Sequence, residues 1–255
     1  MTELVFLPGL AADAVMWQHQ VAAMPSHLDV VVTNVHARHT TLQEMAAALL
    51  QEHPGDLILV GASMGGSLAM EAVRQAPERV KALALLGTNA RPETDAMRTL
   101  REATINMFRQ GRTKAILKVN LPMAFHPSRA DDAALLQTYL DFVLEAGAEQ
   151  LIQQTRALMS RPDARPHLSE ITCPTLVLCG DADRLTPPEC SREIAGLIQG
   201  AEFQLIGQCG HMLTMERPSE VNAALLAWLA HVAPAPHAGG FKSGPSREPS
   251  PSSAH

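Results

Sequence analysis

The sequence contains no run of basic residues and no long apolar run. Its 255 residues include 20 Lys and Arg against 26 Asp and Glu, which gives a formal net charge of −6. Binding to nucleic acid depends on a basic surface that meets phosphates, so nucleic acid is not expected as a partner. A membrane-spanning helix needs roughly 20 apolar residues, so no membrane partner is expected either. The first residues lack the basic segment and apolar stretch of a signal peptide, which predicts a cytoplasmic protein.

Cysteine is also scarce, and its spacing does not suggest a metal or disulfide framework. No pair of cysteines has the CxxC spacing that is typical of zinc sites and redox motifs. Buried, reduced and unreactive thiols are therefore expected, and no metal site. The four positions are Cys173, Cys179, Cys190 and Cys209.

Short β-rich runs alternate with helical patterns along most of the chain. The runs expected to form strands are Leu4–Leu7, Val30–Val35, Leu57–Val60, Val80–Leu86, Thr175–Cys179 and Phe203–Ile206. The helical patterns between them cover about Val15–Met24, Leu42–Gln51, Met64–Gln75, Glu189–Leu197 and Ser219–Leu229. Apolar strands separated by helices predict an α/β fold in which a mainly parallel sheet carries helices on both faces.

The alternation stops between residues 91 and 166, where only helical patterns remain. Helices are expected at about Glu93–Arg109, Thr113–Val119, Asp132–Glu145 and Glu149–Met159. This insertion predicts a helical cap over the carboxyl edge of the sheet, with the core formed by residues 1–90 and 167–233. Prolines bound the insertion at both ends, where they stop helices. Residues 234–255 are rich in Pro, Ser and Gly and poor in apolar side chains, which predicts a disordered tail.

One serine has the sequence context of a nucleophile. Ser63 stands in Gly-Ala-Ser-Met-Gly, directly after the predicted strand Leu57–Val60 and directly before a predicted helix. The pattern G-x-S-x-G between a strand and a helix is typical of a nucleophile elbow, a strained turn that exposes the serine hydroxyl. Side chains at positions 61 and 65 would collide with the neighbouring strand and helix, which explains Gly61 and Gly65.

Two later motifs supply partners for this serine. Asp181 and Asp183 follow the predicted strand Thr175–Cys179, and His211 follows a glycine after the last predicted strand. The order Ser, acid, His after successive strands resembles the α/β-hydrolase family, and the chain is similar to small capped serine carboxylesterases. The resemblance covers residues 3 to 232 and implies a sheet of about six strands. It makes Ser63 the nucleophile, Asp183 the acid and His211 the base of a catalytic triad, with Asp181 bracing the turn.

The resemblance also places the oxyanion hole. Its two backbone N–H donors are expected from Met64, which follows the nucleophile, and from Leu10 in the loop after the first strand. Pro8 stands where relatives often carry a histidine that braces this loop. His36 and His39 fall where relatives have another pattern, and both are expected to be loop residues without a catalytic role. The implied mechanism is acyl transfer through Ser63, followed by hydrolysis, with no cofactor.

A neutral carboxylic ester with a short or medium acyl group is the expected substrate. The sequence offers no cluster of Arg or Lys near the triad motifs for a phosphate or coenzyme A, and Arg184 is the one nearby cation. A lactonase and a C–C bond hydrolase use the same triad, so they remain alternatives, as do a perhydrolase, a non-catalytic receptor and an interaction protein that acts through its tail. Dehalogenase and epoxide hydrolase chemistry needs Asp in place of Ser63.

Monomer and homodimer both remain open. The expected pocket residues are Met107, Phe108, Leu121, Met123, Phe125, Leu185, Met212 and Leu213.

Overall fold

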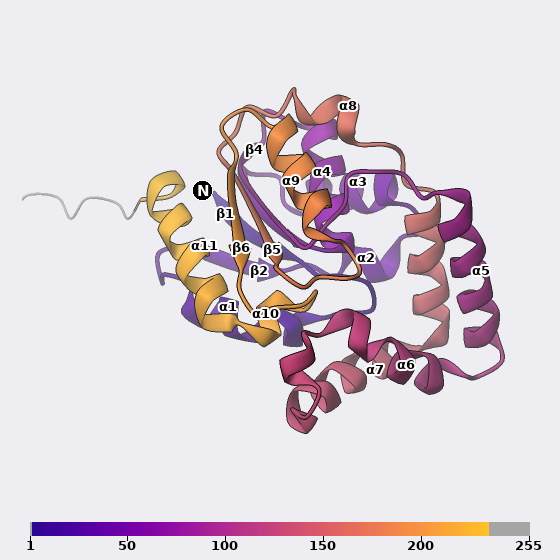
Figure 1. The fold of residues 1–255 in the computed structure, drawn as a ribbon. Coiled ribbons are helices and arrows are strands. Elements are labelled where there is room, and N and C mark those ends of the chain that lie inside the picture. The colour runs from indigo at the N-terminus through magenta and orange to yellow at the C-terminus, as the bar shows by residue number, and fades with distance from the viewer. Residues whose placement is uncertain (1, 235–255) are drawn as a thin grey trace, which may run out of the picture.

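A six-stranded parallel sheet forms the centre of the molecule (Figure 1). The computed structural model describes residues 2–234, so the predicted tail lies outside the described residues except for Pro234. All five strand pairings are parallel, in the order β2-β1-β3-β4-β5-β6. The fold class predicted from the sequence is therefore confirmed. The strands are β1 (Glu3–Leu7), β2 (Asp29–Val32), β3 (Leu57–Ala62), β4 (Val80–Leu86), β5 (Thr175–Gly180) and β6 (Glu202–Ile206).

The second strand is shorter than predicted. The apolar run suggested a strand to Val35, but β2 ends at Val32, and Val35 instead begins the short helix α2 (Val35–Arg38). The N–H of Thr33 donates to the carbonyl of Phe6 at 3.0 Å, and the pairing with β1 stops there. Val35 is nevertheless fully buried. A buried apolar residue at the end of a strand and one at the start of a helix look the same in a sequence, so the prediction was wrong at this end.

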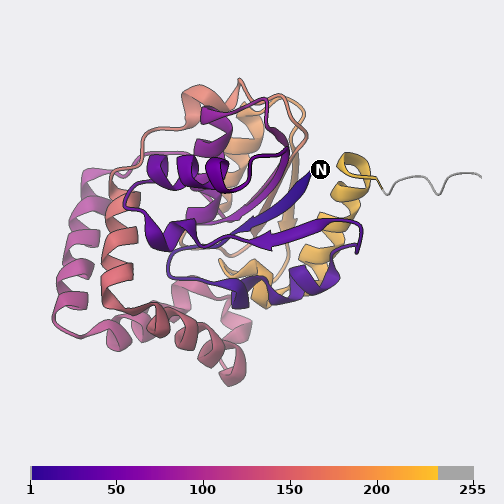
Figure 2. The ribbon, with the colours of Figure 1, turned by 180° about the vertical axis from the view of Figure 1, so that it is seen from behind.

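Helices cover both faces of the sheet, as Figures 1 and 2 show from opposite sides. Alternate strand residues enter two separate apolar clusters, Phe6 and Ile58 on one face and Val5 and Leu59 on the other. The first face is covered by η1 (Ala14–Trp17), α1 (Gln18–Ala23), α10 (Leu213–Glu216) and α11 (Pro218–Val232). The second is covered by α3 (Leu42–Glu52), α4 (Met64–Gln75), α8 (Arg165–Leu168) and α9 (Pro188–Leu197).

Residues 91–166, called the cap segment below, contain helices and no strand. Its elements are α5 (Asp95–Arg109), α6 (Thr113–Ala124), η2 (Pro127–Arg129) and α7 (Ala133–Met159). Helix α7 is broken at Gly147, where φ is 80° and ψ is 164°, a conformation open essentially to glycine alone. The two helices predicted on either side of this position therefore occur as the two halves of α7. No helix within residues 2–234 is both long enough and apolar enough to cross a membrane.

Candidate active site

Ser63 lies at the junction of β3 and α4 in a strained backbone conformation. Its φ is 53° and its ψ is −115°, values that non-glycine residues rarely adopt. The two flanking glycines allow this turn to form. A Cβ on Gly61 would lie 2.3 Å from the carbonyl oxygen of Gly65, and a Cβ on Gly65 would lie 2.0 Å from that of Leu7. Helix α4 therefore starts in direct contact with β3 and β1, and the serine side chain points out of the turn.

The structure brings Ser63, His211 and Asp183 together from three separate loops. The Nε2 atom of His211 lies 3.0 Å from Oγ of Ser63, and its Nδ1 atom lies 2.8 Å from Oδ2 of Asp183. In the tautomer that the carboxylate favours, Nδ1–H donates to Asp183 and Nε2 accepts from the serine hydroxyl. Both the nucleophile-to-base and the base-to-acid hydrogen bond of a serine hydrolase are thus present.

The two competing aspartates have different surroundings. Asp183 is buried, and its Oδ1 accepts hydrogen bonds from the N–H groups of Leu185 and Thr186, each at 2.9 Å. The Thr186 hydroxyl also donates to Oδ2 at 2.8 Å. Asp181 instead accepts from the N–H groups of Gln208 and Cys209, each at 3.0 Å. Asp181 therefore braces the loop that carries the histidine, whereas Asp183 contacts the histidine itself.

The acid and the base stabilise each other's charged forms. Burial lowers the pKa of His211, but the neighbouring Asp183 carboxylate more than offsets this, so the pKa lies above its usual value. Burial raises the pKa of Asp183, but His211 and the Thr186 donors outweigh it and bring that pKa below the usual value. Asp183 thus stays ionised when His211 gains the proton of Ser63, as a triad requires.

The loop that carries His211 is bound to the cap segment. The carbonyl oxygen of Ala124, at the end of α6, accepts from the N–H groups of His211 at 2.9 Å and Met212 at 3.2 Å. The fully buried carboxylate of Glu216 joins the same two parts of the chain, because it accepts from the N–H groups of His126 at 2.8 Å and Gly210 at 3.0 Å. Burial raises the pKa of Glu216 despite these bonds. The position of the base therefore depends on where α6 ends.

The loop after β1, which holds the predicted donor Leu10, contacts the elbow through Gly9. A Cβ on Gly9 would be 3.5 Å from Cβ of Ser63, so the loop after β1 touches the elbow. Within residues 2–234, the N–H groups of Leu10 and Met64 make no hydrogen bond, which leaves both free to donate to an oxyanion. The following residue, Ala11, has a positive φ of 55°.

The histidines after β2 have no contact with the triad. His36 is buried, and its Nε2 lies 2.8 Å from the carbonyl oxygen of Ala12, with burial lowering its pKa. The carbonyl oxygen of His39 accepts from the side chain of Gln153 in α7 at 2.6 Å. His36 thus holds the loop after β1. The expectation of a loop position was wrong for His36, which lies in α2, whereas His39 follows the end of that helix.

The residues predicted to line the pocket fall into two groups. Phe108, Phe125, Met212 and Leu213 are buried in the apolar cluster that the cap segment shares with the sheet, and Leu121 packs against it. Met107 is half-buried. Met123 and Leu185 are 39% and 46% exposed, so they do not form part of a buried wall. Arg184 is exposed.

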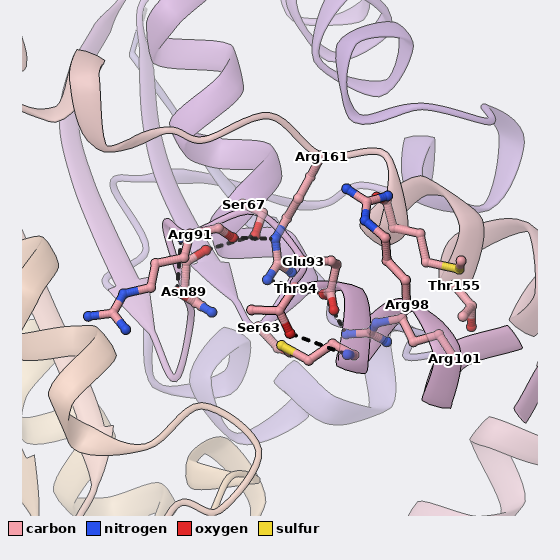
Figure 3. A network of polar contacts seen from close by, with 12 residues as sticks. Ser63, Ser67, Asn89, Arg91, Glu93, Thr94, Arg98, Arg101, Thr155 and Arg161 are labelled. Atoms are coloured by element: carbon pink, nitrogen blue, oxygen red, sulfur yellow. Dashed lines mark hydrogen bonds and ion pairs between the residues drawn. The ribbon is translucent and has the colours of Figure 1, made fainter. Parts of the chain in front are cut away.

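A buried ion cluster fixes the two ends of the cap segment. Glu93 has a fully buried side chain that pairs with Arg101 at 3.0 Å and Arg161 at 3.2 Å. Figure 3 shows Glu93 between these two guanidinium groups. Arg161 also donates from Nε to the carbonyl oxygen of Arg91 at 2.8 Å. One carboxylate thus faces two guanidinium groups, and the contacts of Arg161 tie the start of the cap segment to its end.

Among residues 2–234, no group of three or more His, Cys, Asp or Glu side chains could hold a metal ion. The four cysteines are free, and burial raises the pKa of each thiol, that of Cys179 to about 12. Such thiols are poor nucleophiles at neutral pH.

The whole arrangement matches one family model. The description of that model is alpha/beta hydrolase fold, and it covers residues 3–218. The chain belongs to the α/β-hydrolase fold family. A thermophilic esterase from Thermogutta terrifontis has a similar structure, with a TM-score of 0.82 and 26% identity over 91% of this chain and 90% of that one. The enol-lactonase from Burkholderia xenovorans LB400, at 23% identity, shares the fold with a TM-score of 0.80 over 90% of this chain and 92% of that one.

Curated relatives of this α/β-hydrolase have different named activities. One from Serratia proteamaculans, provisionally named carbamate hydrolase RutD, is 27% identical over 89% of this chain and 90% of its own length. Another from Paraburkholderia phymatum is named 2-hydroxy-6-oxononadienedioate/2-hydroxy-6-oxononatrienedioate hydrolase. It is 31% identical over 67% of this chain and 61% of its own length. The family and the fold are thus shared with hydrolases of several bond types.

Three residues that sequence reasoning missed stand next to the predicted ones. Thr186 follows Asp183 by three residues, a spacing at which a hydroxyl can bond to a carboxylate in a turn. Gln154 is polar but fully buried, on the helix face that also buries Leu151 and Leu158, and this interruption of an apolar face was the signal available. Glu216 offered no comparable signal.

Proposed function

We propose that this protein hydrolyses neutral carboxylic esters with short or medium acyl chains. The observation that carries the proposal is the pair of hydrogen bonds that connects Ser63, His211 and Asp183, at 3.0 Å and 2.8 Å. A serine hydroxyl is a weak nucleophile until a base removes its proton, and an ester carbonyl needs such an activated nucleophile. The likeness to an esterase structure at 26% identity supports the same bond type.

The mechanism follows from the geometry. Ser63 attacks the acyl carbon while His211 takes its proton, and Asp183 holds the resulting imidazolium. The N–H groups of Leu10 and Met64 donate to the oxyanion, and each such donor contributes on the order of 10²–10³ in rate. His211 then protonates the departing alcohol, activates a water molecule, and the acyl group leaves as a carboxylic acid. The steps need no metal or organic cofactor.

The surroundings favour an uncharged substrate. Phe108 and Phe125 of the cap segment share one buried apolar cluster with Met212, the residue that follows His211. A short or medium acyl chain would bury its apolar surface there at about 0.8 kcal/mol for each methylene group.

A C–C bond, lactone or carbamate substrate is the second candidate, and a specific observation favours it. The relative at 31% identity carries the name of a hydrolase for a 2-hydroxy-6-oxo dienedioate. These reactions use the same nucleophile and base, so the triad alone does not separate them from ester hydrolysis.

Turnover of p-nitrophenyl esters of increasing acyl length, with wild type and Ser63→Ala in parallel, tests the proposal. We expect a short- or medium-chain optimum in the wild type and a loss of about 10⁶ in kcat in the variant. Enol-lactones, aryl carbamates and 2-hydroxy-6-oxo dienoates are assayed alongside. Faster turnover of one of these than of every ester would reassign the function. A folded wild type that shows neither turnover nor an acyl burst would point to a receptor.

A further inference from the structure

The loop that carries the predicted oxyanion donor Leu10 forms a tight turn. The N–H of Ala12 donates to the carbonyl oxygen of Gly9 at 3.2 Å, so Leu10 and Ala11 are the two central residues. Ala11 has a φ of 55°, in the left-handed region. A turn with a positive φ at its second central position usually carries Gly or Asn there, because a Cβ makes that conformation unfavourable. Alanine would by itself favour the alternative turn with a negative φ.

The two alternatives differ in the direction of one peptide group. Changing the second central residue from positive to negative φ rotates the peptide between Leu10 and Ala11 by roughly half a turn, together with the ψ of Leu10. The Ala11 N–H and the Leu10 carbonyl oxygen then exchange sides. The Leu10 N–H belongs to the preceding peptide. Because this loop touches Ser63 through Gly9, such a rotation would shift Leu10 relative to the serine. Something outside the turn must therefore hold Ala11 in its observed conformation.

Gln154 of the cap segment makes the contact that selects this conformation. Its Oε1 accepts from the Ala11 N–H at 2.6 Å, and its Nε2 donates to the carbonyl oxygen of His36 at 3.0 Å. Gln154 is fully buried, so its amide has no water to replace either bond. His36 in turn contacts the carbonyl oxygen of Ala12 at 2.8 Å. Two consecutive residues of the loop are thus held by side chains of two helices, Ala11 by Gln154 of α7 and Ala12 by His36 of α2.

We propose that Gln154 is a positioning residue for the oxyanion hole: by accepting the Ala11 N–H, it fixes the turn from which Leu10 donates. This inference rests on the proposed serine hydrolase function. It also explains how the loop is held with Pro8 at its start, since proline has no side-chain donor. The charge that Leu10 would meet develops only in the transition state, so the loss of Gln154 should lower kcat and leave KM nearly unchanged.

The neighbouring residue supplies a matched control. Gln153 lies on the same helix, and its Nε2 donates to the carbonyl oxygen of His39 at 2.6 Å. It therefore links α7 to the same loop after β2, but none of its hydrogen bonds reaches residues 9–12. If Gln154 matters only because it docks the cap segment, Gln153→Met and Gln154→Met should be equally damaging.

Two rates measured on folded variants test the proposal: ester kcat with KM, and the rate at which a p-nitrophenyl phosphonate labels Ser63. For Gln154→Met, which keeps the size of the side chain, we expect both kcat and labelling to fall about 10- to 100-fold, part of the effect of removing an oxyanion donor. Gln153→Met should stay within about twofold of wild type. Adding Ala11→Gly to Gln154→Met should restore much of the loss, because glycine adopts a positive φ without help.

Three results would overturn the proposal: wild-type rates in Gln154→Met, equal losses in Gln153→Met, or no recovery with Ala11→Gly. If Gln154→Met does not fold, Gln154→Glu replaces it. A buried Glu is held in its neutral form, whose carbonyl oxygen accepts the Ala11 N–H and whose hydroxyl donates to the carbonyl oxygen of His36. A folded Gln154→Glu protein that labels more than tenfold slower than wild type would then contradict the assignment. Labelling needs the serine and the oxyanion hole but no natural substrate. A wild type that is labelled yet hydrolyses no ester would reject the proposed substrate class and leave this test intact.

Discussion

Two aspartates only two residues apart have separate roles in this protein. Asp183 is buried against His211, whereas the exposed Asp181 binds backbone N–H groups of the next loop. The difference arises because Asp181 directly follows the last residue of β5, Gly180, where the chain still runs beside the end of β6. Two residues later the chain has turned toward the histidine. Position along the turn, and not residue type, decides which carboxylate can orient the base.

The pH dependence of ester hydrolysis should report this assignment. Only unprotonated His211 can accept the serine proton, and Asp183 raises its pKa, so kcat/KM should rise with pH along a limb centred above 6.5. In Asp183→Asn, burial acts without the opposing charge, so the limb should move to lower pH while kcat falls about 10⁴-fold. Asp181→Asn should keep the wild-type limb and most of the rate. Stopped-flow or steady-state profiles between pH 5 and 9, roughly the range in which a histidine titrates, check both variants. The opposite ranking of the two variants would assign the acid to Asp181.

At the residue scale, the sequence indicated the three hydrogen-bonded side chains but not the residues that hold them in place. Ser63, Asp183 and His211 could be named because each follows a strand in a short motif with glycine nearby. Thr186, Gln154 and Glu216 could not be named, because their roles arise from contacts between distant segments. The hydrogen bond between Gln154 and Ala11, for example, joins positions 143 residues apart. No local pattern reveals such a contact, although the burial of Gln154 within an apolar helix face could have marked it.

At the scale of elements, the elbow depends on how closely α4 approaches the sheet. Gly65 is the second residue of α4, and its backbone lies so close to Leu7 of β1 that no side chain fits between them. A side chain there would push the start of α4 away from the strand and move Ser63 relative to Gly9. The glycine pattern of the motif is therefore a packing requirement between a helix and two strands.

Substitutions of two helical glycines should have opposite effects on stability. Gly65→Ala places a Cβ 2.0 Å from a backbone oxygen that cannot move freely, so we expect the free energy of unfolding to fall by about 2–3 kcal/mol. Gly196→Ala, in α9, meets nothing within 4 Å and should raise it by about 0.5–1 kcal/mol through helix propensity. Urea denaturation of the two variants and the wild type gives both values. A tolerated Gly65→Ala would show that α4 can move away from β1.

Element boundaries were predictable where chemistry marks them. The break in α7 coincides with Gly147, and a glycine between two apolar helical patterns indicated it. At the end of β2, the polar residues Thr33 and Asn34 follow the last strand residue, but the predicted strand ran on to Val35, which is buried in the helix that follows. The sequence does not show whether the buried residue after such a break continues the strand or belongs to the helix that follows.

At the scale of the whole molecule, the cap segment and the sheet share one apolar core. Leu140 and Val143 of α7 belong to the same buried cluster as Phe6 and Ile58 of the sheet, and so does Trp228 of α11. The sequence suggested a separate helical insertion, since only helical patterns occur there. The packing of its side chains against the sheet involves residues far apart in the chain. The hydrophobic periodicity of a sequence predicts helices but not contacts of this kind.

Heat unfolding should therefore occur as one transition. Both tryptophans, Trp17 and Trp228, lie outside the cap segment, and the single tyrosine, Tyr139, lies within it. Tryptophan fluorescence thus follows the core, whereas far-UV circular dichroism follows all helices. We expect the two melting curves to coincide. Leu140→Ala in the cap segment should lower the free energy of unfolding by about 2–5 kcal/mol and move both curves to lower temperature together. Separate midpoints would show that the cap segment unfolds on its own.

The distance along the chain between Ser63 and His211 also determines when during synthesis and folding the two side chains can meet. The two residues are 148 positions apart, and the base reaches the serine only after β5 and β6 have joined the sheet. During synthesis the serine emerges early but remains without its base until nearly the whole chain is made. An unfinished chain therefore carries an inert hydroxyl. On refolding, hydrolytic activity should be the last property to return.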